Sequence, residues 1–193
     1  RPAAGGPGMV LMAGPLDRAL AAATAWHAAV PTVVFLSPDG APLTQSRVRE
    51  FAQRPHLCFV AGRYEGIDQR WIDVNVDAVV SLGDYVLSGG ELAAAVVVDA
   101  CVRLLPGALG DNESTAFESF ADAQGGRLDW PQYALTVGDE PLPVGLSGGD
   151  HAAIQRWRLK QALARTWRRR PDLLVRANLS LEERALIDEI ALE

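Results

Sequence analysis

The chain has 193 residues and a mass of 20.7 kDa, which is enough for one large domain with or without a small second one and excludes a disulfide-stabilised miniprotein. Hydrophobic residues make up 49% of it, and no apolar run reaches the roughly 18 residues that would span a bilayer, so we expect a globular chain. The net charge of -6 is unevenly placed, because residues 1–150 carry -9 and residues 151–193 carry +3.

Cysteine and histidine usage argues against disulfide and metal chemistry. Cys58 and Cys101 each lie in an apolar run, which predicts reduced, packed thiols in a cytoplasmic protein. His27, His56 and His151 are scattered without the spacing of metal ligands, and no Cys-x-x-Cys motif occurs. We therefore expect no dedicated metal site.

The first half of the chain alternates β-rich runs with helical stretches. The β-rich runs cover residues 32–36, 57–61 and 78–81, and each is followed by a segment that contains glycine. Helices are predicted at residues 15–27, 44–53, 66–73 and 91–105. This alternation predicts an α/β fold with buried parallel strands, whose carboxyl ends lie at one edge of the sheet. The three loops are therefore expected to converge on one ligand site.

The second half of the chain changes in character. From residue 109 to 149 the apolar periodicity fades and Gly, Asp and Pro accumulate, which predicts a linker or lid. An amphipathic helix is predicted at residues 151–170, ending at Pro171, and Ser180 with Glu183 forms a capping box for another helix. We accordingly expect a ligand-binding domain at 1–110, an interdomain linker or lid at 111–150 and a small all-helical domain at 151–193.

The helix predicted at residues 151–170 holds most of the positive charge of the tail. Its periodicity places four apolar residues inward, Ile154, Trp157, Leu163 and Trp167. It places four arginines largely outward, Arg156, Arg158, Arg165 and Arg169. Guanidinium groups suit phosphate contacts, so this face is a candidate RNA-binding surface, and an ordinary solvated helix face is the alternative.

A glycine-rich segment follows the third β-rich run. This segment contains Gly83, Gly89 and Gly90, which have no side chains, and it precedes a helix that starts at Glu91. Its main-chain groups can therefore approach and bind a small molecule. The spacing is not that of a dinucleotide fingerprint, and no Gly-x-x-x-x-Gly-Lys-Ser/Thr phosphate loop occurs. By itself the segment is also compatible with a turn that needs glycine for its backbone conformation.

Several strings together resemble the bacterial tRNA (guanine-N1)-methyltransferases of TrmD type. The most specific are residues 62–68 (GRYEGID) and 83–91 (GDYVLSGGE), and further matches in the same order lie at residues 5–9, 36–40, 103–107, 156–158 and 169–171. The resemblance covers nearly the whole chain. It implies a methyltransferase of the trefoil-knot (SPOUT) superfamily, one of the rare knotted folds, with the knot tied by the chain from Leu36 to Leu87.

The resemblance also implies the reaction and its ligands. The methyl group of S-adenosylmethionine goes to N1 of the guanosine just 3′ of the tRNA anticodon. The residues that the resemblance assigns to cofactor binding are Pro38, Gly62, Tyr64, Glu65, Leu82, Gly83, Asp84, Tyr85, Val86, Leu87, Gly89 and Gly90. The family acts as an antiparallel homodimer whose helical domain grips tRNA, which gives the four arginines a role. Family members are described as requiring Mg²⁺, yet no carboxylate cluster in this sequence marks its site.

Methylation of guanine N1 needs a base and a cation. N1 carries a proton and is a poor nucleophile at neutral pH, so a base must take the proton while a cation stabilises negative charge on O6. By resemblance Arg103 supplies the cation, and a helix-terminal arginine that complements the helix dipole is the alternative. The family's base is an aspartate followed by serine, and Glu118 stands in that place before Ser119. Because glutamate is one methylene longer, Glu118 is a working base, a poor one, or a sign of lost activity.

The sequence also departs from the family pattern. Ala3 and Ala4 replace a tyrosine and a glycine, the usual Arg-Pro is missing after Tyr133, and Ala93 replaces a proline. The opening strand and helix of the family would precede Arg1, so we expect that they are missing here. Two alternatives stay open: a knot methyltransferase with another RNA target, and a dimeric RNA- or cofactor-binding protein that no longer catalyses.

Overall fold

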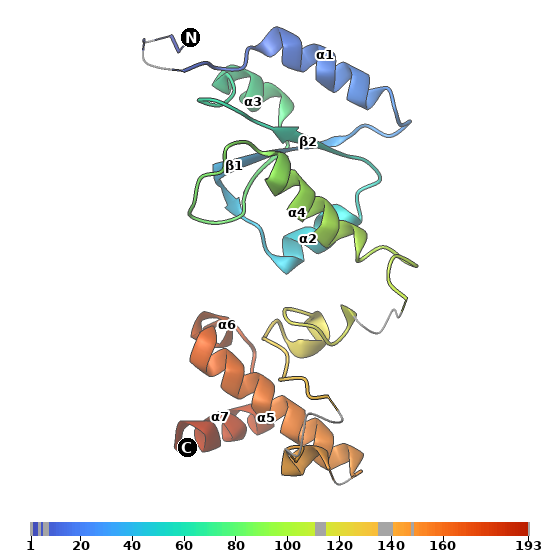
Figure 1. Cartoon of the computed structure of the whole chain (residues 1–193), viewed down its shortest axis with the longest axis vertical. Helices are drawn as coiled ribbons and strands as arrows, with labels where there is room; N and C mark the ends of the chain where they lie inside the picture. Colours follow the sequence, from blue (N-terminus) through green and yellow to red (C-terminus); the bar gives the residue numbers. More distant parts are fainter. Residues whose placement is uncertain are drawn as a thin grey trace. The chain divides into compact units, whose positions relative to one another are not determined.

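The computed structural model divides into two compact units, Arg1–Leu109 and Gly110–Glu193, which we describe separately (Figure 1). It describes residues 2–3, 5, 8–110, 115–134, 141–147 and 149–192. The altered position Ala4 lies outside the described residues, as do residues 135–140 and 148 of the interdomain stretch after Tyr133. No helix within these ranges is long and apolar enough to cross a membrane.

The first unit is built on a parallel sheet, which confirms the α/β prediction. Within the described residues, β1 (Thr32–Pro42), β2 (Leu57–Ala61) and β3 (Ala78–Ser81) pair in the order β2-β1-β3. β1 extends beyond the predicted run, because residues 37–40 leave the ladder and Ala41 then pairs with β3 again. This excursion requires glycine at position 40, where a Cβ would lie 2.4 Å from the backbone nitrogen of Val80.

Helices cover both faces of this sheet (Figure 1). α2 (Gln45–Ala52) and α4 (Glu91–Val102) pack against Val34 and Leu36 of β1. α1 (Ala13–Thr24) and α3 (Gln69–Asn75) pack against Phe35, which lies between those two residues in β1. Successive side chains of a strand point to opposite faces, so residues 33–36 of β1 are buried on both sides of the sheet and are all apolar.

The start of α3 differs from the prediction for a reason of backbone geometry. The helix predicted from residue 66 begins at Gln69, because Gly66 has a φ of 111°, which is not helical. Asp68 takes the capping position, and its Oδ1 accepts a hydrogen bond from the backbone N–H of Arg70 at 3.1 Å. The capping carboxylate therefore sets the boundary.

The second unit is helical and has a core of its own (Figure 1). α5 (His151–Arg169), α6 (Pro171–Val175) and α7 (Leu181–Leu192) enclose Leu163, Leu174, Leu186 and Ile190. The predicted capping box is confirmed. The backbone N–H of Ser180 donates to Glu183 Oε2 at 2.7 Å, and that of Glu183 donates to Ser180 Oγ at 3.2 Å.

Residues 115–134, part of the predicted linker or lid, pack on the helices of the second unit. The backbone N–H of Leu128 donates to Thr166 Oγ1 on α5 at 3.1 Å. The neighbouring side chain of Arg127 is buried and forms an ion pair with Glu183 on α7. A 3-10 turn, η2 (Asp122–Gln124), reverses the chain before Arg127, and a second, η3 (Val144–Leu146), precedes α5.

The prediction that four arginines of α5 face outward is wrong for Arg158 and Arg165. The guanidinium carbon of Arg158 lies 4.9 Å from the centre of the Trp130 ring. Arg165 Nη1 donates to Asp129 Oδ1 at 3.3 Å. Both arginines are half-buried, because residues 115–134 cover this side of the helix. The other two predicted arginines are exposed.

The buried stripe of α5 also differs from the prediction. Trp167, expected inward, is 46% exposed, whereas Thr166 is fully buried. The Thr166 hydroxyl donates to the carbonyl of Ala162 at 2.7 Å and accepts from the N–H of Leu128, so both of its hydrogen-bonding roles are satisfied inside. Thr166 is therefore a buried residue of α5 to which residues 115–134 are hydrogen-bonded, through Leu128.

Candidate functional site

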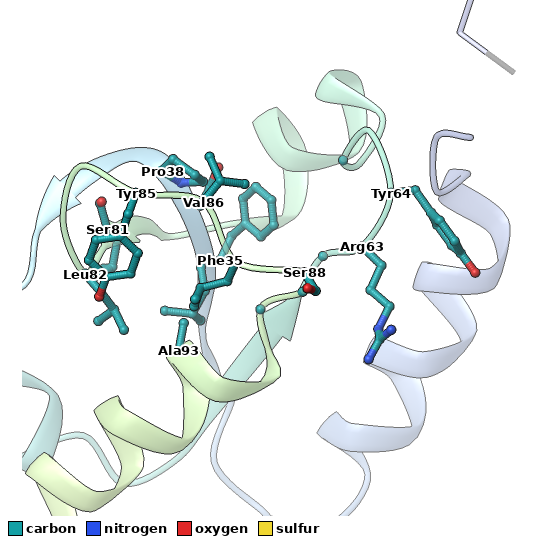
Figure 2. A pocket seen from close by; sticks show the side chains of 18 of the residues that line it. Phe35, Pro38, Arg63, Tyr64, Ser81, Leu82, Tyr85, Val86, Ser88 and Ala93 are labelled. Carbon is teal, nitrogen blue, oxygen red and sulfur yellow. The ribbon is translucent and has the colours of Figure 1, made fainter. Parts of the chain in front are cut away.

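The loops that follow the three strands enclose one pocket of about 260 Å³ (Figure 2). Its walls come from residues 35–38, 62–66, 80–83 and 85–90, together with Ala93 on the first turn of α4. The predicted convergence of the loops on one site is therefore confirmed. Figure 2 shows Pro38, Tyr85 and Val86 toward one end of the pocket and Arg63 and Tyr64 toward the other.

The pocket combines an apolar lining with polar groups. Phe35, Val80 and Ala93 are buried apolar residues of its wall, contributed by β1, β3 and α4. Arg63 and Glu65 add charge from the loop after β2, and both are exposed. Such a lining suits a small ligand with an apolar ring and polar substituents.

Two loops of the pocket touch at Gly90. Its backbone N–H donates to the carbonyl of Gly62 at 2.9 Å. A Cβ at position 90 would lie 2.8 Å from the Cα of Ala61, so a side chain cannot be placed there without moving the backbone. The absence of a side chain at Gly90 thus lets the loop after β3 close against the end of β2.

An ion pair joins the same two segments at the surface. Arg63 Nε lies 2.6 Å from Glu91 Oε1, and both side chains are about half exposed. The hydrogen bond from Arg63 lowers the pKa of the Glu91 carboxyl, and the same bond raises the pKa of the Arg63 guanidinium. Because the pair is exposed, it orients the loops rather than contributing much to stability.

Tyr64 has an unusual backbone conformation. Its φ of 62° lies in the left-handed region, which residues other than glycine rarely adopt. The turn is held because the N–H of Gly66 donates to the carbonyl of Arg63 at 3.2 Å and the N–H of Glu65 donates to that of Met9 at 3.0 Å. Backbone strain of this kind is typical of functional sites, and here it stands at the mouth of a pocket.

The pocket brings together every predicted cofactor residue except Asp84. Asp84 is exposed and is not among the lining residues. The residues of the pocket wall that the sequence does not predict include Phe35 within β1, Arg63 in the loop after β2 and Ser81 at the end of β3. Ser81 is recognisable afterwards as the last residue of β3, where its Oγ both donates to the carbonyl of Gly83 and accepts from its N–H at 3.2 Å.

The comparisons with known proteins agree on one family. The family model described as tRNA (Guanine-1)-methyltransferase TrmD matches residues 1–176. The chain belongs to the TrmD family. A tRNA (guanine-N(1)-)-methyltransferase of Xanthomonas axonopodis pv. citri is 52% identical to it over 195 residues, which cover 100% of this chain and 77% of the relative.

Two further TrmD-family relatives show the same level of similarity. The tRNA (guanine-N(1)-)-methyltransferase of Alcanivorax borkumensis is 50% identical over 198 residues, covering 100% of this chain and 74% of the relative. That of Coxiella burnetii (strain RSA 493) is 51% identical over 191 residues, covering 98% of this chain and 76% of the relative. The resemblance drawn from the motifs is therefore confirmed at the level of the family.

Two residues that the TrmD resemblance singles out lie outside the pocket lining. Arg103 is the C-terminal cap of α4 and half-buried, and its backbone N–H donates to the carbonyl of Asp99 at 3.2 Å. Glu118 lies in the second unit and is also half-buried. Its carbonyl accepts from the N–H of Ala121 at 3.1 Å.

The described part of this TrmD-family chain holds no group of three or more His, Cys, Asp or Glu side chains that could bind a metal ion. No site for the Mg²⁺ that the resemblance suggests is found among these described residues. Cys101 is buried and Cys58 half-buried, and neither forms a disulfide. Burial raises the pKa of both thiols, which keeps them protonated at neutral pH.

Proposed function

We propose that this chain transfers the methyl group of S-adenosylmethionine to N1 of a guanosine in tRNA, at the nucleotide just 3′ of the anticodon. The observation that carries the proposal is the pocket at the ends of β1, β2 and β3, which in this TrmD-family chain is lined by the two most specific family strings, residues 62–66 and 83–90 without Asp84. Bound there, the cofactor supplies an activated methyl group.

The pocket residues fit such a cofactor. The buried wall formed by Phe35, Val80 and Ala93 accommodates a flat apolar ring, and Glu65 offers carboxylate oxygens that accept hydrogen bonds from hydroxyl groups. The contact of Gly90 with the end of β2 holds the loop after β3 at the wall of the pocket.

Glu118 and Arg103 carry the chemistry in this proposal. Glu118 removes the proton from guanine N1 as the nitrogen attacks, and the guanidinium of Arg103 stabilises the negative charge that grows on O6. The lone pair on N1 forms the new bond to the methyl carbon while the bond from that carbon to the sulfur of S-adenosylmethionine breaks, so the sulfur takes the electron pair and S-adenosylhomocysteine leaves. The proton from N1 remains on the Glu118 carboxyl group.

The tRNA contacts are proposed for the exposed arginines of the second unit. Arg169 is exposed at the end of α5, and no ion pair of its side chain is found within the described ranges. Arg156 is exposed too, although it pairs with Glu182 and Glu189 of α7. Half-buried Arg158, stacked on Trp130, is better suited to holding residues 115–134 than to phosphate binding.

A homodimer is proposed from the surface of α4. The helix buries Ala93, Val97 and Cys101 on one side, yet Leu92 and Val96 are 70% and 51% exposed on the other. Apolar side chains that are exposed together on a helix mark an interaction surface, so we expect a partner to cover this face of α4. A second copy of the chain provides one, in keeping with the antiparallel dimer that the resemblance implies.

A trefoil knot between Leu36 and Leu87 is part of the same proposal. Two features support it. β1 leaves its ladder at residues 37–40 and then rejoins β3, and the loop after β3 returns to the end of β2 at Gly62. The first feature falls within Leu36–Leu87, and the second joins Gly62, inside that range, to Gly90, three residues beyond its end.

The proposal is tested with labelled S-adenosylmethionine and two tRNA transcripts that differ only in having G or A just 3′ of the anticodon. We expect incorporation with G alone, and 1-methylguanosine at that nucleotide after digestion. Incorporation only into other RNAs would favour a different target. No incorporation into any RNA by protein that binds the cofactor would favour a binding protein without catalysis.

A further inference from the structure

Both neighbours of Glu118 in the chain are held by hydrogen bonds. The carbonyl of Phe117 accepts from Gln124 Nε2 at 3.3 Å, and Gln124 is buried. Ser119 Oγ donates to Asp129 Oδ1 at 3.0 Å and accepts from the backbone N–H of Asp129 at 3.1 Å. The backbone on either side of Glu118 is therefore fixed within the second unit.

Asp129 is in turn tied to α5 by one side chain. Arg165 Nη1 donates both to the carbonyl of Asp129 and to its Oδ1, each at 3.3 Å. The two charged side chains are about one-third exposed, so the pair is partly shielded from water. A continuous chain of contacts thus runs from Arg165 on α5 through Asp129 to Ser119, the residue next to Glu118.

We propose that Arg165 is a positioning residue for Glu118 and not a contact for RNA phosphate. This inference rests on the proposed function, in which Glu118 is the base. By anchoring Asp129, Arg165 fixes Ser119 and with it the point from which the Glu118 carboxylate reaches guanine N1. The longer reach of glutamate makes this anchoring important, because a misplacement of about 1 Å can cost about a hundredfold in rate.

The alternative role, phosphate binding, conflicts with the contacts of Arg165. To reach a phosphate, its guanidinium would have to leave Asp129, and a half-buried carboxylate would lose its cation. Arg169, one turn further along α5, is exposed and has no such competitor among the residues described. The two arginines of the same helix therefore have different roles.

The test compares Arg165→Ala and Asp129→Asn with Arg169→Ala in the full chain. For each variant the single-turnover rate of methyl transfer is measured at saturating tRNA, and the tRNA affinity is measured over a range of salt concentrations. We expect Arg165→Ala and Asp129→Asn to lower the rate about ten- to a hundredfold while the affinity and its salt dependence stay at the wild-type level. Arg169→Ala should weaken binding and reduce the salt slope by about one.

Two further variants separate positioning from a general structural role. Arg165→Lys keeps a donor for Asp129 and should recover most of the lost rate. In a Glu118→Gln background, Arg165→Ala should lower the residual rate no further, because its effect passes through Glu118. A second, equal loss in that background would contradict the proposal.

Asp129→Asn keeps the inference falsifiable even if Arg165→Ala fails to fold. The substitution removes no cation, so it cannot remove a phosphate contact. Tighter tRNA binding with an unchanged rate would show that it had freed Arg165 to bind phosphate, and would overturn the proposal. If wild-type protein makes 1-methylguanosine and both variants make it equally fast, only this inference fails. If wild-type protein makes none, the proposed function fails as well.

Discussion

At the scale of single residues, the pocket depends on places where two backbones come close. Gly90 lies against the end of β2, and Tyr64 accepts a left-handed conformation in the loop beside it. Neither feature is a contact with a ligand, yet each fixes the position of groups that line the pocket. Substitutions at these positions should therefore lower the affinity for the ligand.

Gly90→Ala should weaken binding of S-adenosylmethionine by at least about tenfold, because the added Cβ would lie 2.8 Å from the Cα of Ala61 and force the two loops apart. Isothermal titration calorimetry measures the affinity directly. The matched control is Gly14→Ala in α1, where the nearest atom to a new Cβ is an Arg18 nitrogen at 3.8 Å, and its affinity should equal that of the wild type. Wild-type affinity in Gly90→Ala would contradict the geometry of the pocket.

The residues of the pocket were predictable to the extent that they belong to specific strings. The sequence predicts Gly62, Tyr64 and Gly90 because their strings resemble a family and follow predicted strands. It predicts Asp84 for the same reason, but a string does not say which of its side chains faces outward. The half-buried positions of Arg158 and Arg165 are not predictable either, since the segment that covers them shows no periodicity.

At the scale of elements, the second unit is held by a charged link between residues 115–134 and α7. Arg127 and Glu183 form an ion pair in which both side chains are nearly buried. Burial by itself raises the pKa of the Glu183 carboxyl, but the hydrogen bonds from the Ser180 N–H and from Arg127 outweigh it and lower that pKa below its usual value of 4.5. The capping box and the ion pair thus share one carboxylate.

Glu183→Gln should destabilise the second unit by about 3 kcal/mol at pH 7, because it leaves the buried Arg127 without a counter-charge. The folded-state pKa of Glu183 is depressed, so its contribution is present at neutral pH and is lost as the pH falls from 4.5 through the depressed value. Urea unfolding of both proteins at several pH values should therefore show the difference between them shrinking in acid.

The neighbouring residue provides the control for this measurement. Glu182 pairs with Arg156 at 3.5 Å, and both side chains are more than half exposed. Glu182→Gln should cost less than about 1 kcal/mol at pH 7. Equal effects of the two substitutions would show that the Arg127–Glu183 pair is not the link that fixes residues 115–134 to α7.

Elements were predicted well where periodicity or capping is local. The parallel strands, the span of α5 and the capping box at Ser180 all follow from short-range patterns. The return of β1 to β3 after residues 37–40 was not predicted, because it depends on the contact of Gly40 with the backbone of a strand about 40 residues away. Residues 115–134 were assigned to a linker because their order comes from side-chain contacts with α5 and α7 and not from a repeat.

At the scale of the whole molecule, the exposed apolar face of α4 is the feature that a single chain leaves unexplained. Val96→Glu should shift the proposed dimer toward monomer, because the carboxylate would be buried without a partner at the interface. Sedimentation velocity over a range of protein concentrations measures the change. Val74→Glu on α3, at a position 82% exposed, should leave the association state as it is. A wild-type chain that stays monomeric at micromolar concentration would contradict the dimer.

The central claim is that Glu118 acts as the base in methylation of guanine N1 in tRNA. The most direct measurement is single-turnover methyl transfer to a tRNA with G just 3′ of the anticodon, comparing wild-type protein with Glu118→Gln and measuring cofactor affinity for both. We expect 1-methylguanosine from the wild type, a loss of at least about a hundredfold in the variant, and equal cofactor affinities. Equal rates for the two proteins would contradict the claim.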